Sequence, residues 1–257
     1  MIDVENLHKS YAGRSVVSGV TAHFPRGSMT SLIGPNGAGK STLLMMMARL
    51  LPPTSGSVSL NGDPVAGIPV EEYVKQVATL RQAPDFNLRL TVEELVGFGR
   101  FPHSRGALTL ADHAAIDRAL EVTSLGPLRK AYIDELSGGQ RQTAFLAMTI
   151  AQDTDYLLLD EPLNNLDMRH AVEIMQTLRA LCVEFGRTVV VVIHDINFAA
   201  NYSDRILALK AGKVHAAGPV ANVVTEDRLR ALYDINLEIL PTASGRVCNY
   251  FNMSEGV

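Results

Sequence analysis

The nine residues GPNGAGKST, from Gly34 to Thr42, constrain the fold of this chain more than any other stretch. They match G-x-x-x-x-G-K-[S/T], in which glycines let backbone N–H groups wrap a phosphate, the lysine reaches the terminal phosphates and the hydroxyl holds Mg²⁺. The strand-like run SMTSLI precedes this phosphate loop, and the helical pattern STLLMMMARLL follows it. The loop is therefore predicted at the N-terminus of a helix, where anions are favoured, within an α/β fold. The predicted phosphate-binding residues are Gly34, Pro35, Asn36, Gly37, Ala38, Gly39, Lys40, Ser41 and Thr42.

The rest of the chain predicts a single domain, residues 1–257, built as an α/β core with an inserted helical subdomain. Short β-rich runs dominate residues 1–90, and helical spacing dominates residues 91–152. A βαβαβ rhythm follows, whose nearly continuous apolar strands suit a parallel sheet buried on both faces. We therefore assign residues 1–90 and 153–240 to the core, 91–152 to the helical subdomain and 241–257 to a C-terminal tail.

Composition excludes several classes of protein. The formal net charge of −4 and a pI near 6.0 provide no broad basic footprint for nucleic acid. No signal-peptide pattern opens the sequence, and no segment approaches the roughly 18 uninterrupted apolar residues of a membrane span. We expect a cytosolic chain whose membrane role would come through a partner. Cys182 and Cys248 lie far apart without metal-ligand spacing, which predicts two reduced cysteines rather than a zinc site or a disulfide.

Two carboxylates follow the apolar run YLLLD. Asp160 and Glu161 fall at the carboxyl end of this predicted strand, the edge where ligands bind in open α/β sheets. Asp160 is predicted to hold Mg²⁺ through water, and Glu161 to polarise the water that attacks the terminal phosphate. The alternative is an ordinary strand that ends in charged residues.

The segment LSGGQRQ, residues 136–142, resembles a second anion site. Two glycines after a serine, at the start of a helix, offer N–H groups to an anion. Because this segment lacks Gly-Lys-Ser, it cannot hold Mg²⁺ and a nucleotide unaided. We expect Ser137, Gly138 and Gly139 to cap the γ-phosphate bound by another copy of the chain. The alternative is a serine N-cap that begins a helix.

Together, GPNGAGKST, LSGGQRQ and YLLLDEP resemble the ATPase subunits of ABC transporters, and the resemblance covers nearly the whole chain. It implies a P-loop NTPase core with a mixed sheet, an N-terminal antiparallel β-region and two copies arranged head to tail around two ATP molecules. It also implies that Gln140 joins the ATP contacts made in trans, and that Asp167 contacts the second copy. Three further residues receive roles from the resemblance: Tyr11 stacks on adenine, Gln82 senses Mg²⁺ and the attacking water, and His194 contacts the γ-phosphate. Taken alone, Tyr11 would more often be a packing residue and His194 a satisfied histidine at a strand end, and a lone Gln82 would carry no information.

A single phosphate loop without membrane spans is typical of an importer subunit that docks on a separate permease. The runs TVEELVGFGRFPH and QRQTAFLAMTIAQDTDYLLLDEPLNNLD resemble the ATPases of ferric-siderophore importers. The implied partners are a second copy, the permease and, indirectly, an extracytoplasmic substrate-binding protein, with the chain peripheral at the cytoplasmic face of the membrane. We expect Ala83 to His103 to contact the permease. Cobalamin, haem or metal-ion import, a DNA-acting ABC ATPase and a regulatory module without turnover are the alternatives.

Overall fold

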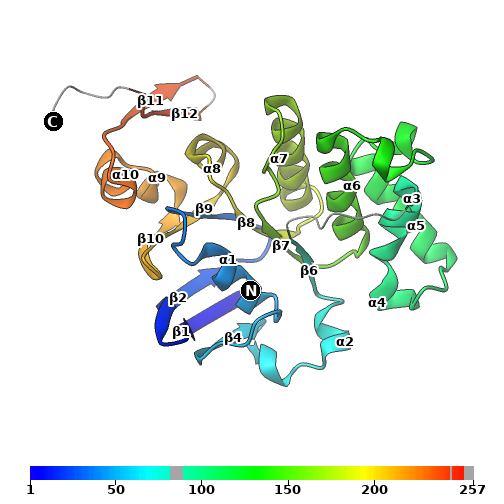
Figure 1. Cartoon of the computed structure of the whole chain (residues 1–257), viewed down its shortest axis with the longest axis horizontal. Coiled ribbons are helices and arrows are strands. Elements are labelled where there is room, and N and C mark those ends of the chain that lie inside the picture. Colours follow the sequence, from blue (N-terminus) through cyan, green and yellow to red (C-terminus); the bar gives the residue numbers. More distant parts are fainter. Residues whose placement is uncertain (82–88, 244, 252–257) are drawn as a thin grey trace. The chain divides into compact units, whose positions relative to one another are not determined.

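The computed structural model describes residues 1–81, 89–243 and 245–251 (Figure 1). It divides into two compact units, one formed by Met1–Gly67 with Val190–Val257 and the other by Ile68–Val189. The phosphate loop belongs to the first unit. The segments LSGGQRQ and YLLLDEP belong to the second. The predicted boundaries between the core and the helical subdomain, at 90/91 and 152/153, stay a prediction.

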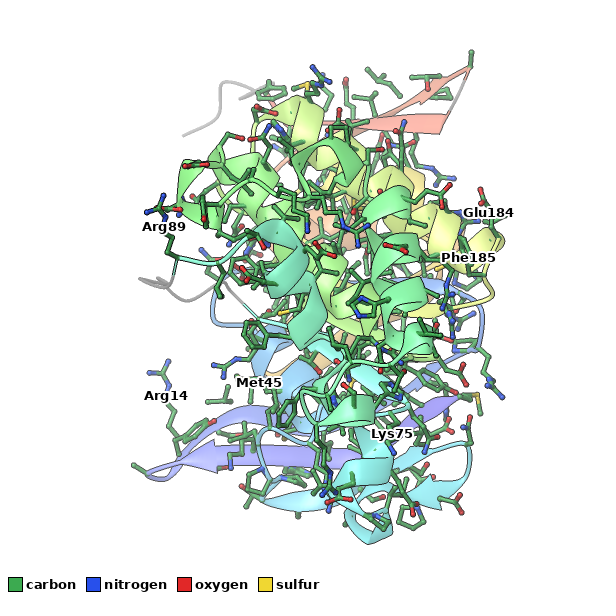
Figure 2. The ribbon with its side chains drawn as sticks, turned by 90° about the vertical axis from the view of Figure 1, so that its right-hand side faces the viewer. Arg14, Met45, Lys75, Arg89, Glu184 and Phe185 are labelled. Carbon is green, nitrogen blue, oxygen red and sulfur yellow. The ribbon has the colours of Figure 1, made fainter. Side chains whose placement is uncertain are left out.

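The first unit begins with the predicted antiparallel sheet. Strand β1 (Ile2–Tyr11) turns through Ala12 and Gly13 into β2 (Arg14–Phe24), and both turn residues have positive φ, of 46° and 82°. Such two-residue turns match the twist of the strands they join. On its other side β1 pairs with β4 (Ser55–Leu60), which continues into β5 (Asp63–Pro64). The side chain of Arg14 extends into solvent from this turn (Figure 2).

A second set of strands in this unit carries the phosphate loop. Strand β3 (Met29–Ile33) is buried throughout and runs parallel to β9 (Arg205–Lys210), which pairs antiparallel with β10 (Lys213–Pro219). Parallel and antiparallel pairs thus occur side by side, as predicted for a mixed sheet. After β3 the loop leads directly into α1 (Lys40–Met47), so the predicted order of strand, loop and helix is confirmed.

The C-terminal part of the first unit contains helices and a hairpin. An apolar cluster that includes Ile33, Ile206 and Leu229 joins the strands to the helices α8 (Ile196–Tyr202), α9 (Val220–Val223) and α10 (Glu226–Tyr233). The segment predicted as a tail, 241–257, contains part of a hairpin formed by β11 (Glu238–Thr242) and β12 (Gly245–Asn249). In Figure 1 this hairpin lies beside α8.

Two asparagines of α8 hold the hairpin through its backbone. Asn197 accepts a hydrogen bond from the backbone N–H of Cys248 at 2.7 Å. One turn later, Asn201 accepts from the N–H of Arg246 at 3.0 Å and donates to the carbonyl of the same residue at 2.8 Å. Because a side-chain amide has one acceptor and two donors, it can pair with a strand as another peptide group does. The prediction of a tail was based on the periodicity of the segment itself, which does not reveal this long-range pairing.

The second unit combines two parallel strands with a group of helices. Strand β6 (Val77–Leu80) runs parallel to β7 (Tyr156–Asp160), and α3, α5 and α6 pack together in the green part of Figure 1. Strand β8 (Thr188–Val192) crosses the division between the units. The helices of this unit are α2 (Val70–Tyr73), α3 (Val92–Phe98), α4 (Phe101–Ser104), α5 (Leu110–Val122), α6 (Gly138–Ala151) and α7 (Met168–Val183). Single 3₁₀ turns occur in this unit at Gly126–Leu128 and Ile133–Glu135, and in the first unit at Val65–Gly67.

Local capping signals explain where the three packed helices of this unit begin. Thr91, Thr109 and Ser137 each accept a hydrogen bond from the backbone three residues later, and the side chain there bonds back to the cap. Such capping boxes satisfy two backbone donors at each helix start. All three helices lie within residues 91–152, where helical spacing was predicted. Nowhere in the described ranges does a helix have the length and apolar character needed to cross a membrane.

A buried ion pair ties these helices together. Arg100 Nε donates to Asp112 Oδ1 at 2.8 Å, and Arg100 Nη1 donates to the carbonyl of Ala151 at 2.8 Å. Both charged side chains are nearly inaccessible to solvent. Hydrogen bonds from Thr109, then from Arg100, hold the pKa of Asp112 well below its usual range. The pair thus links the connection between α3 and α4, the start of α5 and the last turn of α6.

Candidate functional site

The phosphate loop requires glycine at two positions for steric reasons. Gly34 has a φ of 136°, and a Cβ there would lie 2.0 Å from the carbonyl oxygen of Leu209. Gly39 has a φ of 97°, and its Cβ would lie 2.7 Å from the carbonyl oxygen of Val16. A side chain at either position would strain the backbone and collide with a neighbouring strand or turn. The two glycines therefore let the loop pack closely against β2 and β9.

Lys40 is the first residue of α1, and only 5% of it is exposed. Its Nζ donates hydrogen bonds to the carbonyl oxygens of Gly34 at 2.8 Å and Pro35 at 3.0 Å. These bonds hold the ammonium group against the loop that a phosphate would fill. The first backbone N–H groups of a helix have no partner within the helix, and they add a positive dipole end.

The loop therefore fits a polyphosphate. It combines a buried ammonium group, the N-terminus of an eight-residue helix and two glycines that leave no room for side chains. For Mg²⁺ the donor set is sparse, because the described part of the chain contains no cluster of three or more His, Cys, Asp or Glu side chains that could hold a metal. Ser41, the second residue of α1, has a hydroxyl oxygen of the kind that Mg²⁺ accepts, and its role as a ligand stays a prediction.

Two other predicted nucleotide contacts belong to the same unit. Tyr11 ends β1 and is 47% exposed, and the ammonium group of Lys9 lies 5.1 Å from the centre of its ring. His194 is exposed in the short connection between β8 and α8. Both side chains are thus accessible to a ligand, and their contacts with a nucleotide stay predictions.

Asp160 and Glu161 lie at the end of β7, as predicted. Glu161 has a φ of 53°, an uncommon left-handed conformation that costs of order 1–3 kcal/mol when the surroundings impose it. The turn after it is closed by a hydrogen bond of 3.2 Å from the N–H of Asn164 to the carbonyl of Glu161. The Asn164 side-chain amide also donates to Oε2 of Glu161. Our sequence reasoning gave Asn164 no role, although its spacing of three residues from Glu161 within a turn could have suggested this contact.

The segment Ser137–Gln140, which we call the signature segment, forms the first turn of α6. Gln140 N donates to Ser137 Oγ at 3.2 Å, and Ser137 N donates to Gln140 Oε1 at 3.0 Å. The serine N-cap weighed as an alternative is therefore present. It leaves Gly138 open, since a Cβ there would meet nothing within 4 Å. The helix start and its dipole remain suited to an anion, and the contact in trans stays a prediction.

Asp167 lies at the N-cap of α7, seven residues after Asp160. Its Oδ1 accepts from the backbone N–H of His170 at 2.9 Å and lies 2.8 Å from His170 Nδ1. The hydrogen bond from the backbone N–H of His170 is the main cause that lowers the pKa of Asp167, and the hydrogen bond from the His170 side chain is the second. The carboxylate is therefore charged and largely exposed, as a contact with a second copy would require. Gln82, the remaining predicted site residue, lies outside the described residues.

Comparison with known proteins places these features in a family. Residues 17–164 match the family model described as ABC transporter. The chain is 47% identical over 252 residues to the petrobactin import ATP-binding protein YclP of Bacillus subtilis (strain 168), an alignment that covers 98% of this chain and 100% of YclP. It is 41% identical to the iron(3+)-hydroxamate import ATP-binding protein FhuC of the same organism, with 98% and 95% covered.

A solved structure agrees with these relatives. The dimeric structure of MJ0796, a bacterial ABC transporter cassette, superposes with a TM-score of 0.75 at 32% identity, covering 86% of this chain and 99% of that one. The predicted α/β fold is thereby confirmed. With its phosphate loop, signature segment and carboxylates in the predicted local structures, the chain belongs to the ABC transporter family.

Proposed function

We propose that this chain is the ATP-hydrolysing subunit of an importer, and that it drives the uptake of a ferric siderophore through a separate membrane permease. The observation that carries this proposal is the likeness, over nearly the whole chain, to import ATP-binding proteins named for petrobactin and iron(3+)-hydroxamate. Petrobactin and hydroxamate chelators both belong to the siderophores. Cobalamin, haem or metal-ion import remain the alternatives for the cargo.

ATP binding would begin at the phosphate loop. The ammonium group of Lys40 would exchange the carbonyl oxygens of Gly34 and Pro35 for phosphate oxygens. The N–H groups of residues 37–42 would donate to the same phosphates, and the exposed ring of Tyr11 would stack on adenine. The hydroxyl of Ser41 would hold Mg²⁺, together with Asp160 and Gln82 acting through water. Bound there, Mg²⁺ would help to neutralise the negative charge of the phosphates.

Hydrolysis would depend on Glu161. Its carboxylate would accept a proton from the attacking water while the water adds to the γ-phosphorus in line with the departing ADP oxygen. His194 would donate to the γ-phosphate, and Gln82 would orient the water. The left-handed backbone of Glu161 and the hydrogen bond from Asn164 fix where this carboxylate points.

Each site would be completed by a second copy of the chain. Ser137, Gly138, Gly139 and Gln140 of one copy would cap the γ-phosphate held by the phosphate loop of the other, while Asp167 contacts the second copy. Two features support this arrangement: the open first turn of α6, and the exposed carboxylate of Asp167. The likeness to a dimeric ABC transporter cassette supports it further.

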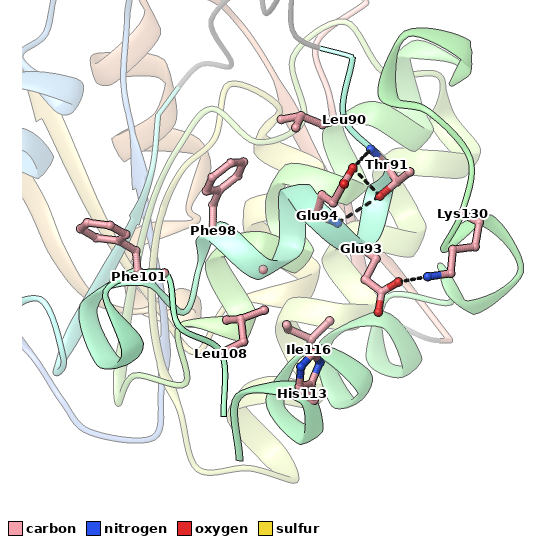
Figure 3. A pocket seen from close by; sticks show the side chains of 12 residues that line it. Leu90, Thr91, Glu93, Glu94, Phe98, Phe101, Leu108, His113, Ile116 and Lys130 are labelled. Carbon is pink, nitrogen blue, oxygen red and sulfur yellow. Dashed lines mark hydrogen bonds and ion pairs between the residues drawn. The ribbon is translucent and has the colours of Figure 1, made fainter. Parts of the chain in front are cut away.

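The permease would dock on an apolar groove of about 660 Å³ in the helical part of the second unit (Figure 3). Phe98 and Phe101 line it and are 53% and 60% exposed, although large apolar side chains normally avoid water. Figure 3 shows both rings in the left half of the view, with Leu90 above them and Leu108 below. The predicted permease contact runs from Ala83 to His103, and its described part, residues 89–103, contributes both phenylalanines. An amphipathic cytoplasmic segment of the permease is the occupant that importer membership favours.

The remaining partners and the location follow from the permease. The chain would lie at the cytoplasmic face of the membrane as a peripheral subunit. An extracytoplasmic substrate-binding protein would deliver the chelate to the other side of the permease and would act on this chain only through it.

Uptake of radiolabelled iron tests the function. Cells that carry Glu161→Gln in place of the wild-type chain should lose the uptake of ferric petrobactin or ferric hydroxamate. Cells that carry Glu184→Gln, the same change at an exposed position after α7, should retain it. Cobalamin and haem uptake are measured in parallel. Normal iron uptake with Glu161→Gln would refute the siderophore assignment, and loss of cobalamin or haem uptake instead would reassign the cargo.

A further inference from the structure

His170 lies between two residues to which the proposed function gives separate roles. Its Nδ1 lies 2.8 Å from Oδ1 of Asp167, the predicted contact to the second copy. Its ring packs directly against Gly139 of the signature segment, where a Cβ would lie 2.5 Å from Cγ and 2.7 Å from Nδ1 of the imidazole. One ring therefore contacts both elements that would face the second copy.

We propose that His170 is a positioning residue that fixes the spacing between the signature segment and Asp167. Both would then contact the second copy as parts of one surface. This inference rests on the proposed function, because it assumes a dimer in which ATP is shared between copies. It adds a residue to which neither the sequence patterns nor the family resemblance gave a role.

The contact geometry suits a spacer. An imidazole has only two side-chain torsions, and both are restricted here because Nδ1 donates to the carboxylate while ring atoms occupy the place that a Cβ of Gly139 would take. The side chain is 23% exposed, so most of it is held by protein. On the Asp167 side, the backbone N–H of His170 donates to the same Oδ1 at 2.9 Å, which anchors the carboxylate twice.

The signature side is equally constrained. Thr143 Oγ1 donates to the carbonyl of Gly139 at 2.9 Å, which holds the first turn of α6 in place. Any side chain at Gly139 would occupy the space of the imidazole, since its Cβ would fall well inside van der Waals contact with three ring atoms. Gly139 is thus required twice, once for the predicted phosphate contact and once for the ring of His170.

A plain packing role predicts a different outcome from a positioning role. If His170 only filled space, its removal would lower the stability of the fold and leave the pairing of correctly folded copies unchanged. If it sets the spacing, folded monomers would bind ATP normally but pair poorly. A pocket of about 460 Å³, lined by His170 with Gln140, Thr143 and Glu173, gives small molecules access to the ring position.

The test uses the full chain with Glu161→Gln as background, because removal of the water-polarising carboxylate should keep ATP bound. Dimerisation with Mg²⁺ and ATP is measured by sedimentation velocity, and ATP binding by the fluorescence of a labelled ATP analogue. We expect Glu161→Gln to dimerise, and Glu161→Gln with His170→Ala to dimerise at least tenfold more weakly. The monomer affinity for ATP should change by less than twofold. Arg169→Ala, the neighbouring exposed change, should leave dimerisation intact.

Imidazole added to the His170→Ala variant provides a second readout that a general loss of folding would not give. Recovery of dimerisation at millimolar imidazole would support the positioning role. Normal dimerisation of the His170→Ala variant would overturn the role of His170 while leaving the proposed function intact. Failure of Glu161→Gln itself to dimerise with ATP would instead overturn the proposed pairing, and the inference with it. If the His170→Ala variant fails to bind ATP, His170 holds up the fold and the inference is wrong.

Discussion

The side-chain amide of Asn164 donates a hydrogen bond to Oε2 of Glu161, three residues earlier in the turn after β7. The orientation of this amide is determined by its partner, because an ionised carboxylate only accepts and therefore faces the NH₂ end of the asparagine. The backbone of the same two residues is joined by the 3.2 Å bond that closes the turn. Glu161 is thus held both by its main chain and by its side chain, before any nucleotide is considered.

Replacing Asn164 by alanine should slow ATP hydrolysis without weakening ATP binding. A hydrogen bond to a charged group contributes about 1.5–3 kcal/mol, and part of that loss would appear as misorientation of Glu161. We expect kcat to fall roughly tenfold, which corresponds to about 1.4 kcal/mol, with KM nearly unchanged. Steady-state hydrolysis assays test this. Asn164→Ser, which keeps a donor, should recover part of the rate. Asn222→Ala, the same loss of an amide at an exposed position of α9, should have no effect. An unchanged kcat for Asn164→Ala would show that Glu161 is oriented without the amide.

Phe98→Asp should abolish siderophore uptake and preserve ATP binding by the isolated subunit. The charge would fall on the wall of the apolar groove, where an apolar partner could not solvate it. Leu110→Asp is a matched control, because Leu110 is 90% exposed at the start of α5 and does not line the groove. Uptake assays in cells and nucleotide-binding assays on purified chain measure the two effects. Normal uptake with Phe98→Asp would show that the permease does not dock on this groove.

Breaking the buried pair between Arg100 and Asp112 should destabilise the second unit strongly. Loss of one partner leaves an uncompensated buried charge, so we expect Arg100→Met to lower the free energy of unfolding by about 3–5 kcal/mol. Arg118→Met removes an exposed arginine that lies 3.5 Å from Asp153, and it should cost at most about 1 kcal/mol. Urea denaturation of both variants gives the comparison. If both variants lost the same free energy of unfolding, burial of the Arg100–Asp112 pair would not determine its contribution to stability.

The stability of the chain at acid pH should depend on Glu93. Hydrogen bonds from Arg129, then from Lys130, lower the pKa of Glu93 from its ordinary value of 4.5 to about 2. Because the folded pKa is depressed, the stabilisation is fully present above about pH 4.5 and is lost as the pH falls towards 2. Urea midpoints measured from pH 2 to pH 7 should therefore fall less steeply below pH 4.5 for Glu93→Gln than for wild type. Glu184→Gln should follow the wild-type curve. Parallel curves for all three chains would show that Glu93 does not contribute to the loss of stability at acid pH.

The features that sequence reasoning predicted well are local in the chain. The phosphate loop, the three capped helices and the strand before Glu161 each depend on residues within a few positions of one another. The helix caps at Thr91, Thr109 and Ser137 follow directly from an N-cap hydroxyl and an acceptor three residues later. Such signals survive in any tertiary context that lets the segment be a helix.

The contacts that sequence reasoning missed join residues far apart in the chain. Asn197 and Cys248 are separated by 51 residues, and Arg100 and Ala151 are separated by the same number. The hairpin looked like a tail because its strands are short and half exposed, so they carry no strong alternation of apolar residues. The role proposed for His170 depends on a contact with Gly139 across two helices. Periodicity in one segment contains no information on which distant segment will pack against it.

The hydrogen bonds of Lys40 to its own loop explain how a buried positive charge is accommodated there. A buried ammonium group without acceptors would be costly, since it has given up its hydration. Here the carbonyl oxygens of Gly34 and Pro35 accept from it. The loop that would bind a phosphate therefore also solvates the ammonium group that would reach that phosphate. One short segment thus both stabilises a buried charge and presents it at a helix N-terminus.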